Sequence, residues 1–283
     1  MKLIESHIVP AGIKNIRLQE YGISIFASAP NKSSLKKAIK RGEIKLDGKI
    51  ANTGDWINEG QKLELYREVK TVKPFNLKLE VLYEDDDLAV INKPSGYPTS
   101  GNYFKTIANA LPFNLKTSQA STALAAPVPV HRLDNPTSGL LLIAKSGDAQ
   151  RKLHIDFKEK KIQKGYHALV QGDFSGHKIF TNEIEGKVSE TEAFAEKNFQ
   201  YKENAVTLVK AYPATGRTHQ IRIHLASNGH PILGDKLYGN SEQISEKSLF
   251  LAATSLKFSH PITKKAMEIV LPLPKKFLKV IGL

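Results

Sequence analysis

The nine residues His131–Gly139 place an imidazole, a guanidinium, a carboxylate and two hydroxyls close together in the chain. Pro136 is incompatible with a helix interior and favours an extended conformation at Asn135, and a short apolar run follows the segment. This pattern predicts a loop at the mouth of a buried strand, where binding and catalytic residues are commonly found. Arg132 and Asp134 are the charged members of this loop.

A second polar segment, Thr215–Arg222, runs into the start of a predicted helix. We expect Thr218 to cap this helix and the helix to continue to Asn228. Arg222 then shares a helix face with His219, three residues before it. Taken singly, the two segments are also compatible with a buried Asp–Arg ion pair that only stabilises the fold.

The sequence lacks the common signatures of metal and cofactor chemistry. It contains no cysteine, no glycine-rich phosphate loop, no dinucleotide-binding fingerprint and no His-Glu-x-x-His pair. His219 and His224 are five residues apart, so a helix turns their side chains away from a shared ligand. We therefore expect no metal site and no cofactor.

The first segment, with His-Arg-Leu-Asp followed by Thr-Ser-Gly, resembles the signature of the RluA family of pseudouridine synthases. Further blocks resemble that family in the same order, so that the resemblance covers roughly residues 77–275. They are Ile91–Gly96, Lys164–Val170, Thr215–Leu225 and Gly229–Gly239. One departure is Leu251-Ala252-Ala253, where relatives often have Leu-His-Ala.

The resemblance implies that the enzyme breaks the glycosidic bond of a uridine in RNA, turns the base and rejoins it through carbon. Asp134 is then the catalytic carboxylate, acting either on the anomeric carbon or on the proton of the neighbouring ribose carbon. A uridine inside folded RNA must be flipped out first. The family pattern implies that Arg132 fills the vacated space, that Tyr166 stacks on the flipped base and that Arg222 keeps Asp134 ionised through a charge-assisted hydrogen bond.

The order of apolar patterns predicts an α+β fold with a mostly antiparallel mixed sheet, and the family resemblance implies a deep RNA-binding cleft in the catalytic domain. Strands are expected at Leu77–Tyr83, Leu88–Ile91, Gly139–Ala144, Tyr166–Gln171 and Ala205–Ala211. Ser146 is expected to cap a helix with Ala149, Leu153 and Phe157 on its apolar face. The stretch 106–129 has no interpretable pattern.

The chain divides into a predicted small domain at 1–70 and a catalytic domain at 71–283, joined by a linker at 67–76. In the small domain, Ser33 or Ser34 is expected to cap a helix that ends at Lys40. A hairpin follows, with its turn at Asp47-Gly48. The predicted basic surface of the helix consists of Lys36, Lys37, Lys40 and Arg41.

Residues 16–67 resemble the small RNA-binding domain named after ribosomal protein S-four, in which a basic helix and an adjacent strand hold structured RNA. This domain also precedes the catalytic domain in some members of the RluA family. The resemblance implies that the basic helix binds RNA. The alternative is a small packing domain whose lysines are only solvated.

The composition is that of an ordinary globular protein, with 41% hydrophobic and 24% charged residues, and its net charge of +13 favours a polyanionic partner. No apolar run is long enough to span a membrane, so we expect a cytoplasmic protein. We also expect this protein to be a monomer. Its predicted substrate is structured RNA, with ribosomal RNA preferred and transfer RNA second. The alternatives are a non-catalytic RNA-binding or ribosome-assembly factor, and a glycosylase that would release uracil.

Overall fold

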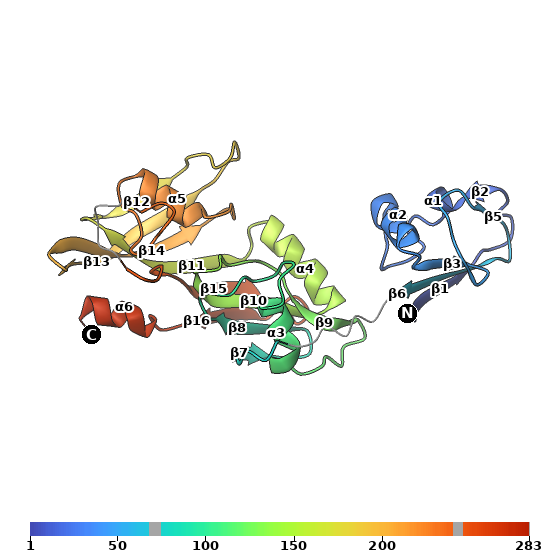
Figure 1. Cartoon of the computed structure of the whole chain (residues 1–283), viewed down its shortest axis with the longest axis horizontal. Coiled ribbons are helices and arrows are strands. Elements are labelled where there is room, and N and C mark those ends of the chain that lie inside the picture. Colours follow the sequence, from blue (N-terminus) through green and yellow to red (C-terminus); the bar gives the residue numbers. More distant parts are fainter. Residues whose placement is uncertain (68–74, 240–245, 283) are drawn as a thin grey trace. The chain divides into compact units, whose positions relative to one another are not determined.

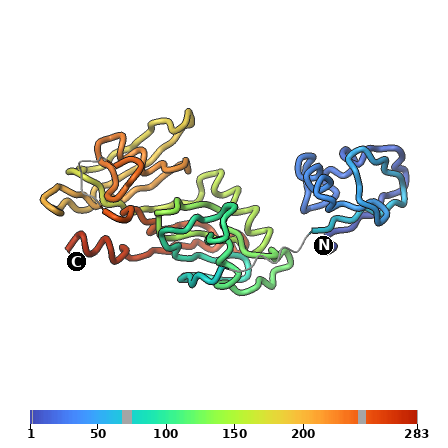
Figure 2. Tube along the Cα trace, in the orientation of Figure 1, coloured from blue at the N-terminus to red at the C-terminus, as the bar shows by residue number. Residues whose placement is uncertain are grey.

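The computed structural model describes residues 1–67, 75–239 and 246–282. The chain forms two compact units, Met1–Val72 and Lys73–Leu283 (Figures 1 and 2). Most of the predicted linker at 67–76 lies outside the described residues. None of the helices in the described ranges is long and apolar enough to cross a membrane.

The smaller unit contains a four-stranded antiparallel sheet in the order β1-β6-β3-β4 and a separate pair, β2 and β5. Its core includes Leu18, Leu35, Ile44 and Leu63, all fully buried. The elements are β1 (Lys2–Ile8), β2 (Ile16–Arg17), α1 (Leu18–Tyr21), α2 (Lys32–Lys40), β3 (Ile44–Leu46), β4 (Lys49–Ile50), β5 (Trp56–Ile57) and β6 (Lys62–Arg67).

Helix α2 begins two or three residues earlier than a cap at Ser33 or Ser34 implies, so the predicted cap was wrong. Asn31 is the N-cap, and its side chain accepts a hydrogen bond from the backbone N–H of Ser34 at 2.9 Å. The Ser34 hydroxyl accepts in return from the backbone N–H of Asn31, which completes a capping box. Leu35 and Ile39 are buried on the same face, as their spacing predicts.

The larger unit is built on one ten-stranded sheet with the main order β12-β13-β14-β11-β15-β10-β8-β7, while β16 pairs with β15 and β9 with β10. Its strands are β7 (Glu80–Glu84), β8 (Leu88–Lys93), β9 (Ala123–Pro129), β10 (Ser138–Ser146), β11 (Gln163–Gln171), β12 (His177–Phe180), β13 (Thr191–Tyr201), β14 (Asn204–Pro213), β15 (Leu251–Ser259) and β16 (Ala266–Val270). Its helices are α3 (Ile107–Asn114), α4 (Gly147–Lys158), α5 (Gln220–Ser227) and α6 (Lys275–Ile281).

The strand pairs of this sheet are antiparallel except for β10 and β15, which run parallel where they meet. Gly139 pairs with Ala253 at this junction and has a φ of +114°. A Cβ on Gly139 would lie 2.0 Å from the backbone oxygen of Ala253, so only glycine allows this approach. The junction therefore sets the position of the loop that enters β10.

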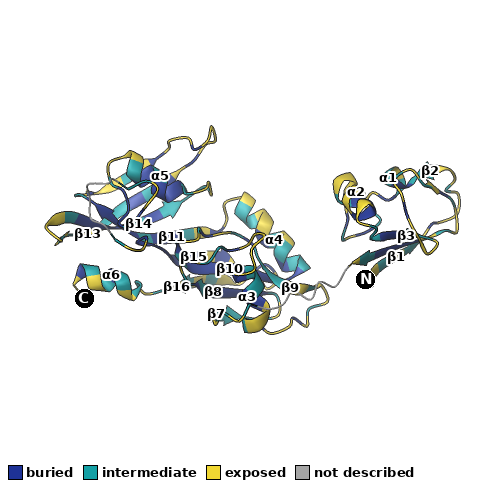
Figure 3. Cartoon of the chain, in the orientation of Figure 1, coloured by how far each residue is buried: buried dark blue, intermediate teal, exposed yellow. Residues whose placement is uncertain are grey.

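The helices cover separate parts of this sheet, with α4 against β10 and α5 against β13 and β14 (Figure 1). Burial is concentrated along β10, β15 and β8, whereas α4 and α6 each keep an exposed side (Figure 3). Ser146 caps α4 as predicted, and Ala149 and Leu153 are buried. The architecture confirms the predicted α+β class with a mostly antiparallel sheet.

One sequence expectation in this unit needs correction, and one stretch without an expectation can now be described. The strand predicted from Leu77 begins only at Glu80, because the residues before it are held by the side chain of Asn114 rather than by a neighbouring strand. The uninterpreted stretch 106–129 contains α3 and β9, and Thr106 caps α3. Pro112 inside α3 and Pro127 inside β9 weaken the periodic pattern on which sequence reasoning depends.

Candidate active site

Asp134 lies in the loop between β9 and β10, and hydrogen bonds from several segments fix that loop. The backbone oxygen of Asp134 accepts a hydrogen bond from the N–H of Thr137 at 3.1 Å. The backbone N–H of Leu133 donates to the hydroxyl oxygen of Thr99, and that hydroxyl donates to the Leu133 carbonyl. The N–H of Gly96 donates to the carbonyl of the next loop residue, Asn135, at 2.8 Å. The carboxylate is therefore presented by a rigid backbone.

Lys93 at the end of β8 is fully buried beneath this loop. Its Nζ donates to three backbone carbonyls, those of Pro94, Asn135 and Thr137, at 3.0, 3.2 and 2.8 Å. Burial lowers the pKa of Lys93 to about 8, although the negative charge of Asp134 opposes that shift. Lys93 thus ties the Asn-Lys-Pro block to the Asp134 loop and adds positive charge behind the carboxylate.

Helix α5 brings two further side chains toward Asp134. It begins at Gln220, and its N-cap is His219 in a left-handed conformation with a φ of +56°, so the predicted cap at Thr218 was wrong. The Nε2 atom of His219 lies 3.9 Å from Oδ2 of Asp134, and its Nδ1 is 3.0 Å from the hydroxyl of Tyr238. Such backbone strain is often found at functional sites.

Arg222 lies within ion-pair distance of Asp134, as predicted, but its hydrogen bonds go to a second carboxylate. Its Nε and Nη2 donate to Asp235 at 2.8 and 2.7 Å, whereas its Nη1 is 3.7 Å from Oδ2 of Asp134. Burial alone would lower the pKa of Arg222, but the hydrogen bond to Asp235 and the charges of Asp235 and Asp134 raise it. The guanidinium is therefore oriented by Asp235 and shares its charge with Asp134, rather than forming a simple pair with Asp134.

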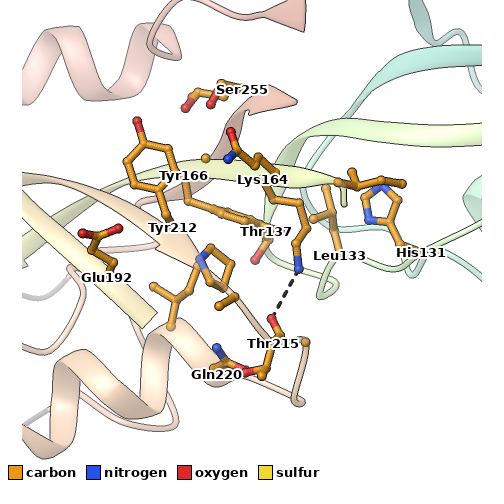
Figure 4. A pocket seen from close by; sticks show the side chains of 18 of the residues that line it. His131, Leu133, Thr137, Lys164, Tyr166, Glu192, Tyr212, Thr215, Gln220 and Ser255 are labelled. Carbon is orange, nitrogen blue, oxygen red and sulfur yellow. Dashed lines mark hydrogen bonds between the residues drawn. The ribbon is translucent and has the colours of Figure 1, made fainter. Parts of the chain in front are cut away.

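A cleft of about 1030 Å³ is lined by Asp134, and Arg132, Tyr166 and His219 also line it. Figure 4 shows Tyr166 among the side chains of this lining. Tyr166 projects from β11 and is only 8% exposed. Its burial, together with the charge of Asp134, raises the pKa of its hydroxyl, so the phenol stays neutral at physiological pH. Arg132 is exposed at the edge of the cleft. The structure thus brings Arg132, Asp134 and Tyr166 to one cleft, with Arg222 directly behind the carboxylate.

His131 supports the loop rather than the chemistry. Its Nε2 accepts a hydrogen bond from the backbone N–H of Leu142 at 3.0 Å, which requires that nitrogen to be unprotonated. Burial and the nearby charge of Lys164 lower the pKa of His131 to about 3. Among the described residues, no three His, Asp or Glu side chains converge as a metal site requires.

Two members of the site were not assigned a role from the sequence. Lys93 and Asp235 both lie inside blocks that resemble the RluA family, but neither spacing nor residue type shows that one supports the loop from below and the other holds Arg222. Lys36, Lys37, Lys40 and Arg41 belong to the smaller unit and are all exposed, as predicted.

Known proteins are similar to this chain in sequence. A model of the RNA pseudouridylate synthase family matches residues 87–227. An uncharacterized RNA pseudouridine synthase of Aquifex aeolicus is 34% identical over 280 residues, which cover 88% of each chain. Ribosomal large subunit pseudouridine synthase C of Escherichia coli is 35% identical over 280 residues, which cover 86% of this chain and 85% of the relative. The chain belongs to the RNA pseudouridine synthase family.

Solved structures support the same assignment. Human RNA Pseudouridylate Synthase Domain Containing 1 matches this RNA pseudouridine synthase with a TM-score of 0.58 and 25% identity, over 73% of this chain and 86% of the human chain. Human RNA Pseudouridylate Synthase Domain Containing 4 shares the fold, with a TM-score of 0.58 and 24% identity over 72% of this chain. The enzyme class predicted from the motif blocks is thereby confirmed.

Proposed function

We propose that this RNA pseudouridine synthase converts specific uridines of structured RNA to pseudouridine, with Asp134 as the catalytic carboxylate. Ribosomal RNA of the large subunit is the first candidate substrate, because several relatives of similar length carry that name, and transfer RNA is the second. The observation that supports the proposal best is the position of Asp134, at the base of a large cleft and 3.7 Å from the buried cation of Arg222.

The proposed reaction is an isomerisation that conserves every atom of the nucleotide. The bond between the sugar C1′ and the base N1 breaks, a bond between C1′ and C5 forms, C5 loses its proton and N1 gains one. Asp134 acts on the sugar as an anion, and the nearby charge of Arg222 favours that ionised state. All of these groups belong to the chain itself, so the proposal includes no metal ion and no cofactor.

The target base must leave its stack to reach Asp134. Extruding a base costs a few kcal/mol, which contacts with the flipped nucleotide must offset. We assign this to Tyr166, whose ring lines the cleft and stacks on the flipped base, and to Arg132, which is exposed at the cleft and fills the space left in the RNA. Both roles are part of the proposal.

The smaller unit is proposed to bind the same RNA as an S-four-type domain, through the exposed residues of α2. We expect the enzyme to act as a monomer, and a cytoplasmic location stays a prediction.

The test is the variant Asp134→Asn, which keeps the side-chain volume and removes the charge. We expect loss of pseudouridine formation in single-turnover assays on large-subunit ribosomal RNA, with unchanged thermal stability and nearly unchanged RNA affinity. Comparable rates for the variant and the wild type would contradict the role of Asp134. A wild-type enzyme that binds RNA without forming product would support the non-catalytic alternative, and released uracil would support a glycosylase.

A further inference from the structure

Lys164 of β11 is a half-buried cation that lines the cleft and has little to bind within the protein. Within the described residues, its side chain forms one hydrogen bond, from Nζ to the backbone carbonyl of Thr215 at 3.3 Å, the dashed line in Figure 4. No carboxylate in the part of the chain that the structure describes lies within 4 Å of Nζ. Burial lowers the pKa of Lys164, and no neighbouring negative charge opposes the shift.

The three Lys and Arg side chains of the larger unit that are fully buried among the described residues are better satisfied. Lys93 donates to three carbonyls, Arg222 has two aspartates within 4 Å, and Lys145 has a glutamate oxygen at 2.6 Å. Lys276, which does not line the cleft, lies over two phenylalanine rings. Because burying a charge without a partner is unfavourable, a cation like Lys164 facing an open cleft indicates an anionic ligand there.

A second polar group in the same cleft is also left unsatisfied by folding. The hydroxyl of Thr137 is buried and has no hydrogen-bond partner among the described residues. Thr137 lines the cleft, three residues after Asp134. Since buried hydroxyl groups are normally hydrogen-bonded, this one is available to a polar ligand that enters the cleft.

The charged residues that line the cleft also favour an anionic ligand. Six basic residues line the cleft and form no ion pair within the described ranges: Arg132, Lys158, Lys160, Lys164, Lys210 and Arg217. The first four lie in the chain between the loop before β10 and the start of β11, and we call these four residues the basic wall. The acidic lining residues other than Asp134 come from different segments, at Glu190, Glu192 and Glu268. A phosphate backbone is therefore attracted to the basic wall.

We propose that Lys164 binds one of the two phosphates that flank the target uridine, and that the Thr137 hydroxyl donates a hydrogen bond to the sugar–phosphate of the same nucleotide. This inference rests on the proposed function. Lys164 and Tyr166 are two residues apart on one strand, a separation of about 7 Å. A comparable distance separates the base of a nucleotide from its phosphates, so a base on Tyr166 places a phosphate near Lys164.

The experiment uses a stem–loop of large-subunit ribosomal RNA in which either flanking phosphate is replaced by a neutral methylphosphonate. Equilibrium affinity and kcat/KM are measured for the wild type, for Lys164→Gln and for Lys257→Gln. The last variant is the matched control, because Lys257 also lines the cleft but pairs with Glu268 at 3.0 Å. For the wild type we expect about a tenfold or greater loss of affinity with one of the two substituted RNAs, as for one hydrogen bond to a charged group.

Lys164→Gln should bind the unmodified RNA about tenfold more weakly and lose nothing further with the methylphosphonate. Lys257→Gln should behave as the wild type does. If Lys164→Gln remained as sensitive as the wild type, or if the wild type were insensitive at both phosphates, the inference would be overturned. If Lys164→Gln does not fold, the wild type alone still tests the inference, because insensitivity of its affinity to both methylphosphonates would overturn it. Because affinity needs no turnover, absence of product would contradict the proposed function without deciding this inference.

The variant Thr137→Val tests the second contact. It removes a hydroxyl that has no hydrogen-bond partner among the described residues, so thermal stability should stay the same or rise, while KM for the RNA rises. A fall in stability with unchanged KM would show that the hydroxyl serves the fold and would remove Thr137 from the site.

Discussion

Asp235 determines how the positive charge behind Asp134 is oriented. Its side chain is fully buried, and it accepts hydrogen bonds from Arg222 and from the backbone N–H groups of Leu237 and Tyr238. These hydrogen bonds and the charge of Arg222 hold the pKa of Asp235 below its ordinary value, although burial alone would raise it. Because Asp235 accepts the hydrogen bonds of Arg222, the guanidinium can lie 3.7 Å from Asp134 without a hydrogen bond to it.

We expect Asp235→Asn to damage both folding and catalysis. It leaves the guanidinium of Arg222 buried beside an uncharged group, and breaking a buried pair typically costs about 3–5 kcal/mol of unfolding free energy. Urea denaturation and single-turnover rates measure the two effects. The control is Asp148→Asn, which removes a surface ion pair with Arg151 and should cost less than about 1 kcal/mol. Equal losses of unfolding free energy for the two variants would contradict the prediction that the buried Arg222–Asp235 pair matters more to the fold than a surface pair.

His131 should make the fold sensitive to acid. Because its pKa falls from 6.5 to about 3 on folding, the unfolded chain binds a proton below pH 6.5 that the folded chain does not, and stability decreases as the pH falls from 6.5 toward 3. His131→Gln keeps an acceptor for the N–H of Leu142 and cannot titrate. The wild type should therefore lose more stability than the variant over this range, by at most about 1.4 kcal/mol per pH unit. Identical pH profiles in chemical denaturation would contradict the prediction.

At the scale of elements, local patterns predicted much of the fold. The alternating or apolar runs at β8, β10, β11 and β14 and the Ser146 cap of α4 were correct, because each is specified by residues that are adjacent in the chain. What could not be predicted depends on partners far away in sequence. β1 exists because it pairs with β6, some sixty residues later.

The site shows the same division. Asp134 and Tyr166 were found from motif blocks, and the structure brings both to one cleft. The predicted Arg222–Asp134 ion pair is present at 3.7 Å, but the hydrogen bonds of the guanidinium go to Asp235, because residue types alone do not show which of two nearby aspartates receives the forked hydrogen bonds. The cap of α5 was also predicted wrongly. Local sequence preferences disfavour a left-handed backbone conformation at a histidine, so the conformation of His219 depends on the surrounding structure.

The β10–β15 junction yields an element-scale prediction. Gly139→Ala puts a methyl group into the backbone of Ala253 at a left-handed φ, so the two parallel strands must separate. We expect loss of several kcal/mol of unfolding free energy or failure to fold, and loss of activity in any folded fraction. Gly216→Ala is the control, because nothing lies within 4 Å of a Cβ there. A Gly139→Ala enzyme as stable as the control would show that the junction tolerates separation.

At the scale of the whole molecule, the net charge of +13 belongs to a chain of two compact units. The larger unit holds the cleft, Asp134 and the basic wall. In the smaller unit, the apolar side of α2 packs into a core while its lysines remain exposed. Phosphate contacts from such lysines position an RNA without reading its bases, whereas choosing one uridine requires contacts at the cleft.

The basic surface of α2 gives the final prediction. Lys36, Lys37 and Lys40 are exposed and form no ion pair within the described residues, whereas Arg41 donates two hydrogen bonds to Glu43 at 2.6 and 2.8 Å. Changing the three lysines to Gln should weaken binding of a large structured RNA and flatten its salt dependence, by something under about one unit of log–log slope per lost contact. Turnover at saturating RNA should change little, because Asp134 belongs to the other unit.

Arg41→Gln is the matched control for this surface. Its guanidinium is already engaged by Glu43, so we expect a smaller loss of affinity and of salt slope than for a single lysine variant such as Lys37→Gln. Filter binding or fluorescence titration over a range of salt concentrations gives both quantities, and thermal melting checks that the unit stays folded. If the triple lysine variant kept the affinity and the slope of the wild type, α2 would be a solvated surface and the smaller unit would hold RNA elsewhere or not at all.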